Sequence, residues 1–233
     1  MTIDYDHAKN IHTLQGPKIA LPIILGGLNP VSVLDVGCGT GVWLKAAIEL
    51  GIADIFGIDG ANITQEKLLI SRERFKCHDL STSWNLGRRF DVAICFEMAE
   101  HLDEISAETL IRSITAHSDT VLFSAACPGQ DGQHHINCQW PSYWQQIFNN
   151  QGFVCDDAIR WRIWNIHDIE PWYRQNMFLA TRDIERAGSE KRIASVIHPE
   201  MIKWLKIERS EQNAHSKSLL KSRVTALLRN MRR

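Results

Sequence analysis

The sequence contains no hydrophobic run long enough to cross a membrane. Its longest apolar stretch, residues 19–28, spans ten positions and includes Pro22, whereas a transmembrane helix needs about 20 apolar residues. The first residues are acidic and lack the basic segment and apolar core of a secretion signal. These absences argue against a membrane-spanning or exported protein, and we expect a cytoplasmic one.

Closely spaced cysteine pairs are also absent. The six cysteines lie far apart, and none forms a C-x-x-C pair. This spacing argues against a zinc cage or a disulfide framework and favours free thiols in a reducing compartment. The chain shows no internal repeat, and its 233 residues are 44% hydrophobic, which excludes a disordered or fibrous protein.

The net charge of −1 conceals an uneven distribution. Residues 181–233 carry 13 Lys and Arg against 6 Asp and Glu, whereas residues 1–180 carry 13 against 21. The acidic body argues against a broad nucleic-acid footprint, so RNA is the less favoured partner. The basic end has the charge to contact phosphate or anionic lipid.

Segments with strand and helix character alternate through the first two thirds of the chain. Strands that alternate with helices indicate a parallel sheet covered by helices on both faces. The expected strands are residues 31–36, 54–58, 75–80, 91–96 and 120–126, and the expected helices are residues 42–50, 63–70, 105–117 and 141–150.

The alternation changes toward the C-terminus. Residues 153–164 and 172–181 predict two strands without a helix between them, and such strands usually pair antiparallel. The sequence therefore predicts one domain over residues 1–182, in which residues 1–29 form a helical lead-in. A basic helical extension is expected over residues 183–233.

A glycine cluster joins the first expected strand to the first helix after it. Residues 33–41 read Val-Leu-Asp-Val-Gly-Cys-Gly-Thr-Gly, which is G-x-G-x-G rather than the G-x-G-x-x-G of dinucleotide folds. Glycines there allow a tight turn and leave room for a ligand at the helix N-terminus. Asp35 precedes the first glycine, where its charge would repel a diphosphate and favour a cationic ligand.

This segment resembles motif I of the class I S-adenosylmethionine-dependent methyltransferases. The strand order is similar to their Rossmann-like, seven-stranded, mostly parallel sheet with a C-terminal antiparallel hairpin. The resemblance covers about residues 30–180. It implies that the backbone around Gly37, Cys38 and Gly39 holds the methionine part of S-adenosylmethionine, with Asp35 near its ammonium group.

The resemblance places further cofactor contacts at the ends of the next strands. Asp59, followed by Gly60, stands where the family has the acid that accepts both ribose hydroxyls. Asp79, followed by Leu80, stands where the family contacts the adenine amino group, and Phe96 completes the implied set. The alternative interpretation of Asp59 and Asp79 is a carboxylate that caps a turn.

Two carboxylates and a histidine follow the fourth expected strand. Glu97, Glu100 and His101 lie at the sheet edge where open α/β folds bind ligands. If this segment is helical, Glu97 and His101 share a face, and their oxygen and nitrogen atoms suit a divalent ion. The loop after the fifth strand offers His134 or His135 as a fourth ligand.

This E-x-x-E-H pattern with a distant histidine resembles two metal-assisted branches of the family. They are the ubiquinone-pathway O-methyltransferases and the small-RNA terminal 2′-O-methyltransferases, and the implied ion is Mg²⁺ or Mn²⁺. The run from His135 to Trp144 resembles a signature of methyltransferases encoded with glycan-assembly enzymes, which favours His135 over His134. In the metal-free alternative, His101 or His135 acts as the general base.

Aromatic residues crowd the segment after this loop. Five tryptophans fall within residues 140–172, and aromatic rings can stack on a sugar face or on a base. Trp140, Tyr143 and Trp144 are the predicted acceptor contacts, and the alternative is that they belong to the core.

The sequence thus predicts an O-methyltransferase that uses S-adenosylmethionine and modifies a sugar hydroxyl of a glycan or glycosylated metabolite. Terminal ribose 2′-O-methylation of RNA is the alternative within the same class, and a non-catalytic cofactor-binding assembly protein is the alternative outside it. Two interpretations of the basic tail stay open. It is either a helix that packs on the body or on a second copy, or a peripheral anchor on an anionic membrane.

Overall fold

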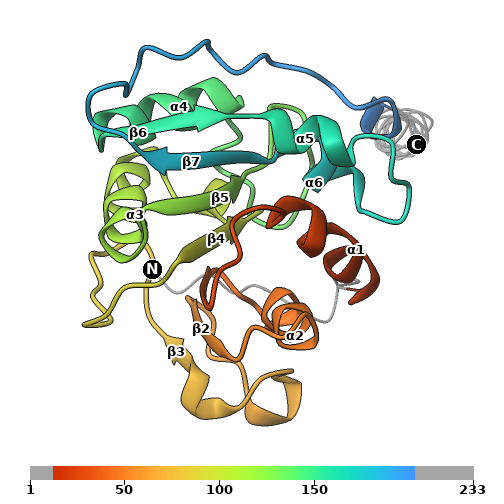
Figure 1. Cartoon of the computed structure of the whole chain (residues 1–233), viewed down its shortest axis with the longest axis vertical. Coiled ribbons are helices and arrows are strands. Elements are labelled where there is room, and N and C mark those ends of the chain that lie inside the picture. Colours follow the sequence, from red (N-terminus) through yellow and green to blue (C-terminus); the bar gives the residue numbers. More distant parts are fainter. Residues whose placement is uncertain (1–12, 203–233) are drawn as a thin grey trace, which may run out of the picture. The chain divides into compact units, whose positions relative to one another are not determined.

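The computed structural model describes residues 13–202 of the chain. The described residues up to Val196 belong to one compact unit, and residues 197–202 belong to a second. The first unit contains a seven-stranded sheet with the order β3-β2-β1-β4-β5-β7-β6 (Figure 1). The strands are β1 (Ser32–Val36), β2 (Asp54–Asp59), β3 (Phe75–Cys77), β4 (Val92–Phe96), β5 (Thr120–Ser124), β6 (Phe153–Asp156) and β7 (Phe178–Arg182).

The first five strands run parallel, and β7 pairs antiparallel with both β5 and β6. This topology confirms the predicted Rossmann-like sheet. Every residue of β1 and of β4 is buried, as continuous apolar runs require when helices cover both faces of a parallel sheet. The carboxyl ends of the parallel strands therefore meet at one edge of the sheet, where a ligand can bind.

Helices cover the two faces of the sheet and form a separate core on each. On one face lie α1 (Gln15–Ile24), α2 (Val42–Glu49), α5 (Ala158–Ile163) and α6 (Pro171–Asn176). On the other face lie α3 (Glu104–His117) and α4 (Pro141–Asn150). None of the helices in the described region has the length and apolarity needed to span a bilayer.

One predicted helix is replaced by an irregular segment. Residues 63–70 form no α-helix, only the short 3₁₀ turn η2 (Gln65–Lys67), which is followed by a second, η3 (Arg72–Arg74). The buried side chains of this segment are Ile63, Leu68 and Ile70. Their spacings of five and two residues do not match a helical face, so they anchor a loop instead.

The two C-terminal strands are shorter than predicted because two helices lie between them. Residues 158–163 and 171–176 form α5 and α6 rather than strand. Ile159 and Ile163 are both buried, and their spacing of four is helical. Pro171 occupies the first turn of α6, where its missing N–H costs no hydrogen bond.

An irregular strap, residues 183–196, follows β7 and crosses α4 and β6 (blue in Figure 1). The predicted helical extension begins here, but residues 183–196 contain no helix, and residues 203–233 lie outside the described part of the chain. Glu190 fastens the strap, because its Oε1 accepts hydrogen bonds from Gln145 Nε2 at 2.9 Å and Asn149 Nδ2 at 2.6 Å. The compact unit thus extends past the last strand.

We expect Glu190→Ala to lower the free energy of unfolding by about 2 kcal/mol, because hydrogen bonds to a charged group are lost. Burial alone would raise the pKa of Glu190, but the bonds from Gln145 and Asn149 lower it. The stability that Glu190 contributes is therefore present above the pKa of the unfolded side chain, about 4.3, and is lost as the pH falls below it. Urea denaturation at several pH values measures the effect. Glu185→Ala, a change at an exposed strap position, is the control, and equal losses for both variants would contradict the assigned role.

Candidate functional site

The turn after β1 can be built only with glycine at its key positions. Gly37, Gly39 and Gly41 have φ values of +77°, +51° and +84°, in the left-handed region that favours glycine. A Cβ atom at Gly37 would lie 2.2 Å from Cγ of Met98. The Gly37 N–H donates to the carbonyl oxygen of Ile58 at 2.8 Å, which fixes the turn against the end of β2.

Two buried carboxylates border this turn. Asp59 accepts hydrogen bonds from the N–H groups of Gly39 and Ala61, each at 2.7 Å. Asp35 is 2% exposed, and its Oδ2 has no hydrogen-bond partner within residues 13–202. Burial and, to a smaller extent, the charge of Asp59 raise the pKa of Asp35 well above its ordinary range. A buried oxygen without a donor is costly unless a ligand supplies one, so the turn has the character of a seat for a cationic group.

The other predicted cofactor residues take different positions. Asp79 is bound within its own turn, where its Oδ1 accepts from the N–H and the hydroxyl of Ser81. The side chains of Leu80, Cys38 and Phe96 are packed in the core, and the Phe96 ring lies against another aromatic ring at a centroid distance of 4.7 Å. Gly60 follows β2, and a Cβ there would make only an ordinary van der Waals contact with the carbonyl oxygen of His78 at 3.9 Å.

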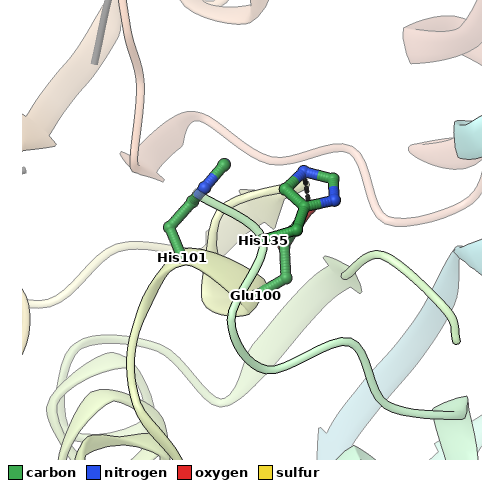
Figure 2. Close-up of side chains that lie close together, drawn as sticks. All are labelled: Glu100, His101 and His135. Atoms are coloured by element: carbon green, nitrogen blue, oxygen red, sulfur yellow. Dashed lines mark ion pairs between the residues drawn. The ribbon is translucent and has the colours of Figure 1, made fainter. Parts of the chain in front are cut away.

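A carboxylate and two imidazoles meet beside the end of β4, and we call Glu100, His101 and His135 the acid–imidazole trio. The first two belong to the 3₁₀ turn η4 (Ala99–His101), and His135 belongs to the loop between β5 and α4. One ligand atom from each lies within 4.8 Å of the others (Figure 2). His135 Nε2 lies 3.9 Å from Glu100 Oε1.

The backbone explains why these distant segments meet. The carbonyl oxygen of Glu100 accepts hydrogen bonds from the N–H groups of Ile136 and Asn137, each at 3.0 Å. These two bonds hold the loop against η4 and bring the ring of His135, rather than that of His134, to the buried carboxylate. The loop also positions His101, whose Nδ1 lies 3.4 Å from the carbonyl oxygen of His134.

The trio has the electrostatic character of a set of metal ligands. The side chain of Glu100 is fully buried, and neither carboxylate oxygen has a hydrogen-bond partner in the described region. Burial and the charge of Glu97 raise the pKa of Glu100 well above its ordinary range. Burial and the neighbouring His135 lower the pKa of His101 to about 4, so this imidazole is neutral near pH 7, which is the form in which histidine binds metal ions.

Glu97, one of the four predicted metal ligands, does not join the trio. Its backbone is left-handed, with φ +49°, and the turn that follows is a 3₁₀ turn rather than an α-helix. The predicted shared face of Glu97 and His101 is therefore lost. Glu97 instead accepts hydrogen bonds from Gln130 Nε2 at 2.6 Å and from Asn176 Nδ2 at 3.2 Å. Gln130 and Asn176 belong to no motif, so no sequence signal indicated this pairing.

The predicted acceptor aromatics divide into two groups. Trp144 is 1% exposed and packs against Phe123 with ring centroids 5.3 Å apart. It is therefore a core residue, and its prediction as an acceptor contact is wrong for this structure. Trp140 and Tyr143, at the start of α4, remain partly exposed. Adjacent helical residues point about 100° apart, which explains why Tyr143 and Trp144 differ.

Comparisons with known proteins place the chain in a family. A family model described as a methyltransferase domain matches residues 7–166. A ubiquinone biosynthesis O-methyltransferase of Pseudoalteromonas translucida is 34% identical over 93 residues, covering 34% of this chain and 36% of that protein. A ribosomal protein L11 methyltransferase of Laribacter hongkongensis is 36% identical over 77 residues, covering 30% and 25%. The chain thus matches about a quarter to a third of the length of these relatives.

Solved structures agree on the fold. The sugar N-methyltransferase KedS8 from a Streptoalloteichus species has a TM-score of 0.56 at 16% identity, covering 76% of this chain and 90% of that one. The amino pentose methyltransferase CalS10 from Micromonospora echinaspora has a TM-score of 0.53 at 15% identity, covering 73% and 92%. The chain belongs to the methyltransferase domain family and has the Rossmann-like fold of the class I S-adenosylmethionine-dependent methyltransferases.

Proposed function

We propose that the chain is an S-adenosylmethionine-dependent O-methyltransferase that modifies a sugar hydroxyl of a glycan or glycosylated metabolite with the help of a divalent ion. The observation that supports it most directly is the acid–imidazole trio at the edge of the sheet. The trio borders the glycine turn, because Met98, two residues before Glu100, packs at Gly37. An acceptor oxygen held by the trio would therefore stand beside the cofactor seat.

The residues around the glycine turn fit S-adenosylmethionine, which supplies an electrophilic methyl group on a positively charged sulfur. Asp35 offers a buried carboxylate oxygen that lacks a donor among the described residues, and the cofactor's ammonium group is such a donor. Asp59, at the end of β2, would accept the ribose hydroxyls. Gly37 and Gly39 make the left-handed turn, and neither carries a side chain of its own where the methionine part would lie.

The acceptor hydroxyl needs activation, because an alcohol is a weak nucleophile until its proton leaves. A bound divalent ion would lower the pKa of a coordinated hydroxyl and fix its position. Glu100, His101 and His135 would hold that ion. Two imidazole nitrogens and one carboxylate oxygen suit Mn²⁺ and similar transition metals better than Mg²⁺, which prefers oxygen ligands.

The pKa of His101 favours a ligand role over a general-base role for this residue. A general base works best when its pKa lies near the operating pH. Burial lowers the pKa of His101 to about 4, so its imidazole takes up a proton reluctantly near neutral pH. A low pKa does not hinder metal binding, since the neutral imidazole is the form that binds.

The charge of the site favours a neutral acceptor over RNA. Asp35, Glu97 and Glu100 form no ion pair with Lys or Arg within residues 13–202, whereas proteins that bind RNA or DNA neutralise phosphates with such cations. The names of the similar sugar methyltransferases agree with a sugar acceptor, although their low identity shows the fold alone. Most of the basic tail lies outside the described residues and adds nothing to this choice.

An acceptor screen with labelled S-adenosylmethionine, run with and without chelator, tests the proposal. We expect label on a sugar hydroxyl, a loss of rate of about tenfold or more with chelator, and better recovery with Mn²⁺ than with Mg²⁺. Activity that requires a free RNA 3′ end would instead support ribose methylation. Turnover that chelator leaves unchanged would contradict the role of the ion, and the absence of turnover with every acceptor would support a non-catalytic protein.

We expect Asp59→Ala to weaken binding of S-adenosylmethionine by about tenfold or more, because two hydrogen bonds to a carboxylate are worth at least about 1.4 kcal/mol. Isothermal titration calorimetry measures the affinity. Asp54→Ala is the matched control, since Asp54 begins the same strand and pairs with Arg88 at the surface. An unchanged affinity in the Asp59 variant would remove Asp59 from the cofactor site.

We expect Trp140→Ala to raise the KM of the acceptor by about tenfold, because stacking an aromatic ring on a ligand contributes roughly 1–3 kcal/mol. The Kd of S-adenosylmethionine should stay within about twofold. Steady-state kinetics with the acceptor from the screen give the first value, and calorimetry gives the second. Trp161→Ala, at an exposed position on α5, serves as control, and an equal effect there would count against an acceptor contact at Trp140.

A further inference from the structure

Three polar side chains form a closed cluster beside the trio, and we call Glu97, Gln130 and Asn176 the amide lock. Glu97 Oε2 accepts from Gln130 Nε2 at 2.6 Å, and Glu97 Oε1 accepts from Asn176 Nδ2 at 3.2 Å. Asn176 Nδ2 also donates to Gln130 Oε1 at 2.9 Å. The lock therefore joins the end of β4, the loop between β5 and α4, and the end of α6.

The chemistry of these groups fixes the orientation of each amide. Gln130 turns its NH₂ group to the accepting carboxylate of Glu97 and its carbonyl oxygen to the donating NH₂ group of Asn176. The Oδ1 of Asn176 in turn accepts from Gln175 Nε2 at 3.0 Å. Gln130 is 9% exposed and Asn176 is 1% exposed. A buried network whose members satisfy one another holds a single conformation.

The backbone of Gln130 extends the lock to the trio. Its carbonyl oxygen lies 3.1 Å from Nδ1 of His135. A carbonyl oxygen can only accept, so whenever the imidazole is neutral this contact places its proton on Nδ1. The Nε2 atom then keeps its lone pair, and it is the atom that faces Glu100 Oε1 at 3.9 Å.

We infer that Gln130 is a positioning residue, which the amide lock holds so that its carbonyl oxygen orients His135 and fixes its tautomer with Nε2 free. In this arrangement Glu97 acts as the anchor of the lock and not as a ligand of the ion. Hydrogen bonds to the second nitrogen of a ligating histidine orient the ring in this way in metal sites. The inference rests on the proposed function only where it refers to a metal ion. The tautomer of His135 is a property of the chain without any ligand.

Nuclear magnetic resonance of the full chain, labelled with ¹⁵N-histidine and free of metal, tests the tautomer. His135→Gln assigns the resonances of His135. We expect the wild-type ring to carry its proton on Nδ1, and we expect Gln130→Ala to populate both tautomers. Gln146→Ala is the matched control, because Gln146 is an exposed residue of α4. A wild-type proton on Nε2, or an unchanged His135 spectrum in Gln130→Ala, would overturn the inference.

Gln130→Met keeps the length of the side chain without the amide and replaces the alanine variant if that variant does not fold. It should show the same mixture of tautomers. The circular dichroism spectrum of each variant shows whether the fold is kept before its resonances are interpreted.

Titration with MnCl₂ alone, followed by electron paramagnetic resonance, tests whether Glu97 anchors the amide lock or is a ligand of the ion. We expect Gln130→Ala to weaken Mn²⁺ binding by about 10–100-fold, as loss of outer hydrogen bonds does, and Glu100→Gln to abolish it. Glu97→Gln should retain measurable binding. If Glu97→Gln abolishes binding while His135 keeps its wild-type tautomer, Glu97 is a ligand and the inference is wrong. If the wild type binds no Mn²⁺, the ion of the proposed function fails, and the tautomer comparison alone decides the role of Gln130.

Discussion

The candidate site depends on two hydrogen bonds that the backbone carbonyl of Glu100 accepts from Ile136 and Asn137. They hold the loop between β5 and α4 against the turn η4. The side chain of the same Glu100 is the buried carboxylate that His135 faces. The backbone of Glu100 therefore docks the loop, and its side chain is the carboxylate that the imidazole of His135 faces.

The same edge of the sheet carries features that oppose folding. Glu97 has a left-handed backbone, which costs a non-glycine residue roughly 1–3 kcal/mol. Asp35 and Glu100 bury oxygens without donors in the described part of the chain. Such features persist where the surrounding structure over-determines them, and they concentrate at functional sites. A cationic cofactor and a metal ion would relieve these charges, so ligand binding and stability should be linked in this protein.

The sequence predicted the structure correctly where a local residue pattern determines it. The apolar runs of β1 and β4 and the glycines between residues 37 and 41 are local patterns, and the sheet and the turn match them. The position of the Glu97 side chain was not predicted. The left-handed backbone of Glu97 itself turns this side chain away from the face that helical spacing indicated. Trp144 resembled an acceptor contact by composition, yet its direction on α4 placed it in the core. Residue spacing alone does not predict where the side chains of Glu97 and Trp144 point. Both directions depend on tertiary contacts with neighbouring segments.

The strap over residues 183–196 has a consequence for the outer edge of the sheet. β6 is an edge strand, and an edge strand exposes backbone groups that can recruit another chain and start aggregation. Here the N–H of Cys155 is bound by Glu190, and the carbonyl oxygen of Phe153 is bound by Asn149. Side chains thus occupy backbone hydrogen-bonding positions on β6 that a strand of another molecule would need. This occupation disfavours edge-to-edge association through β6.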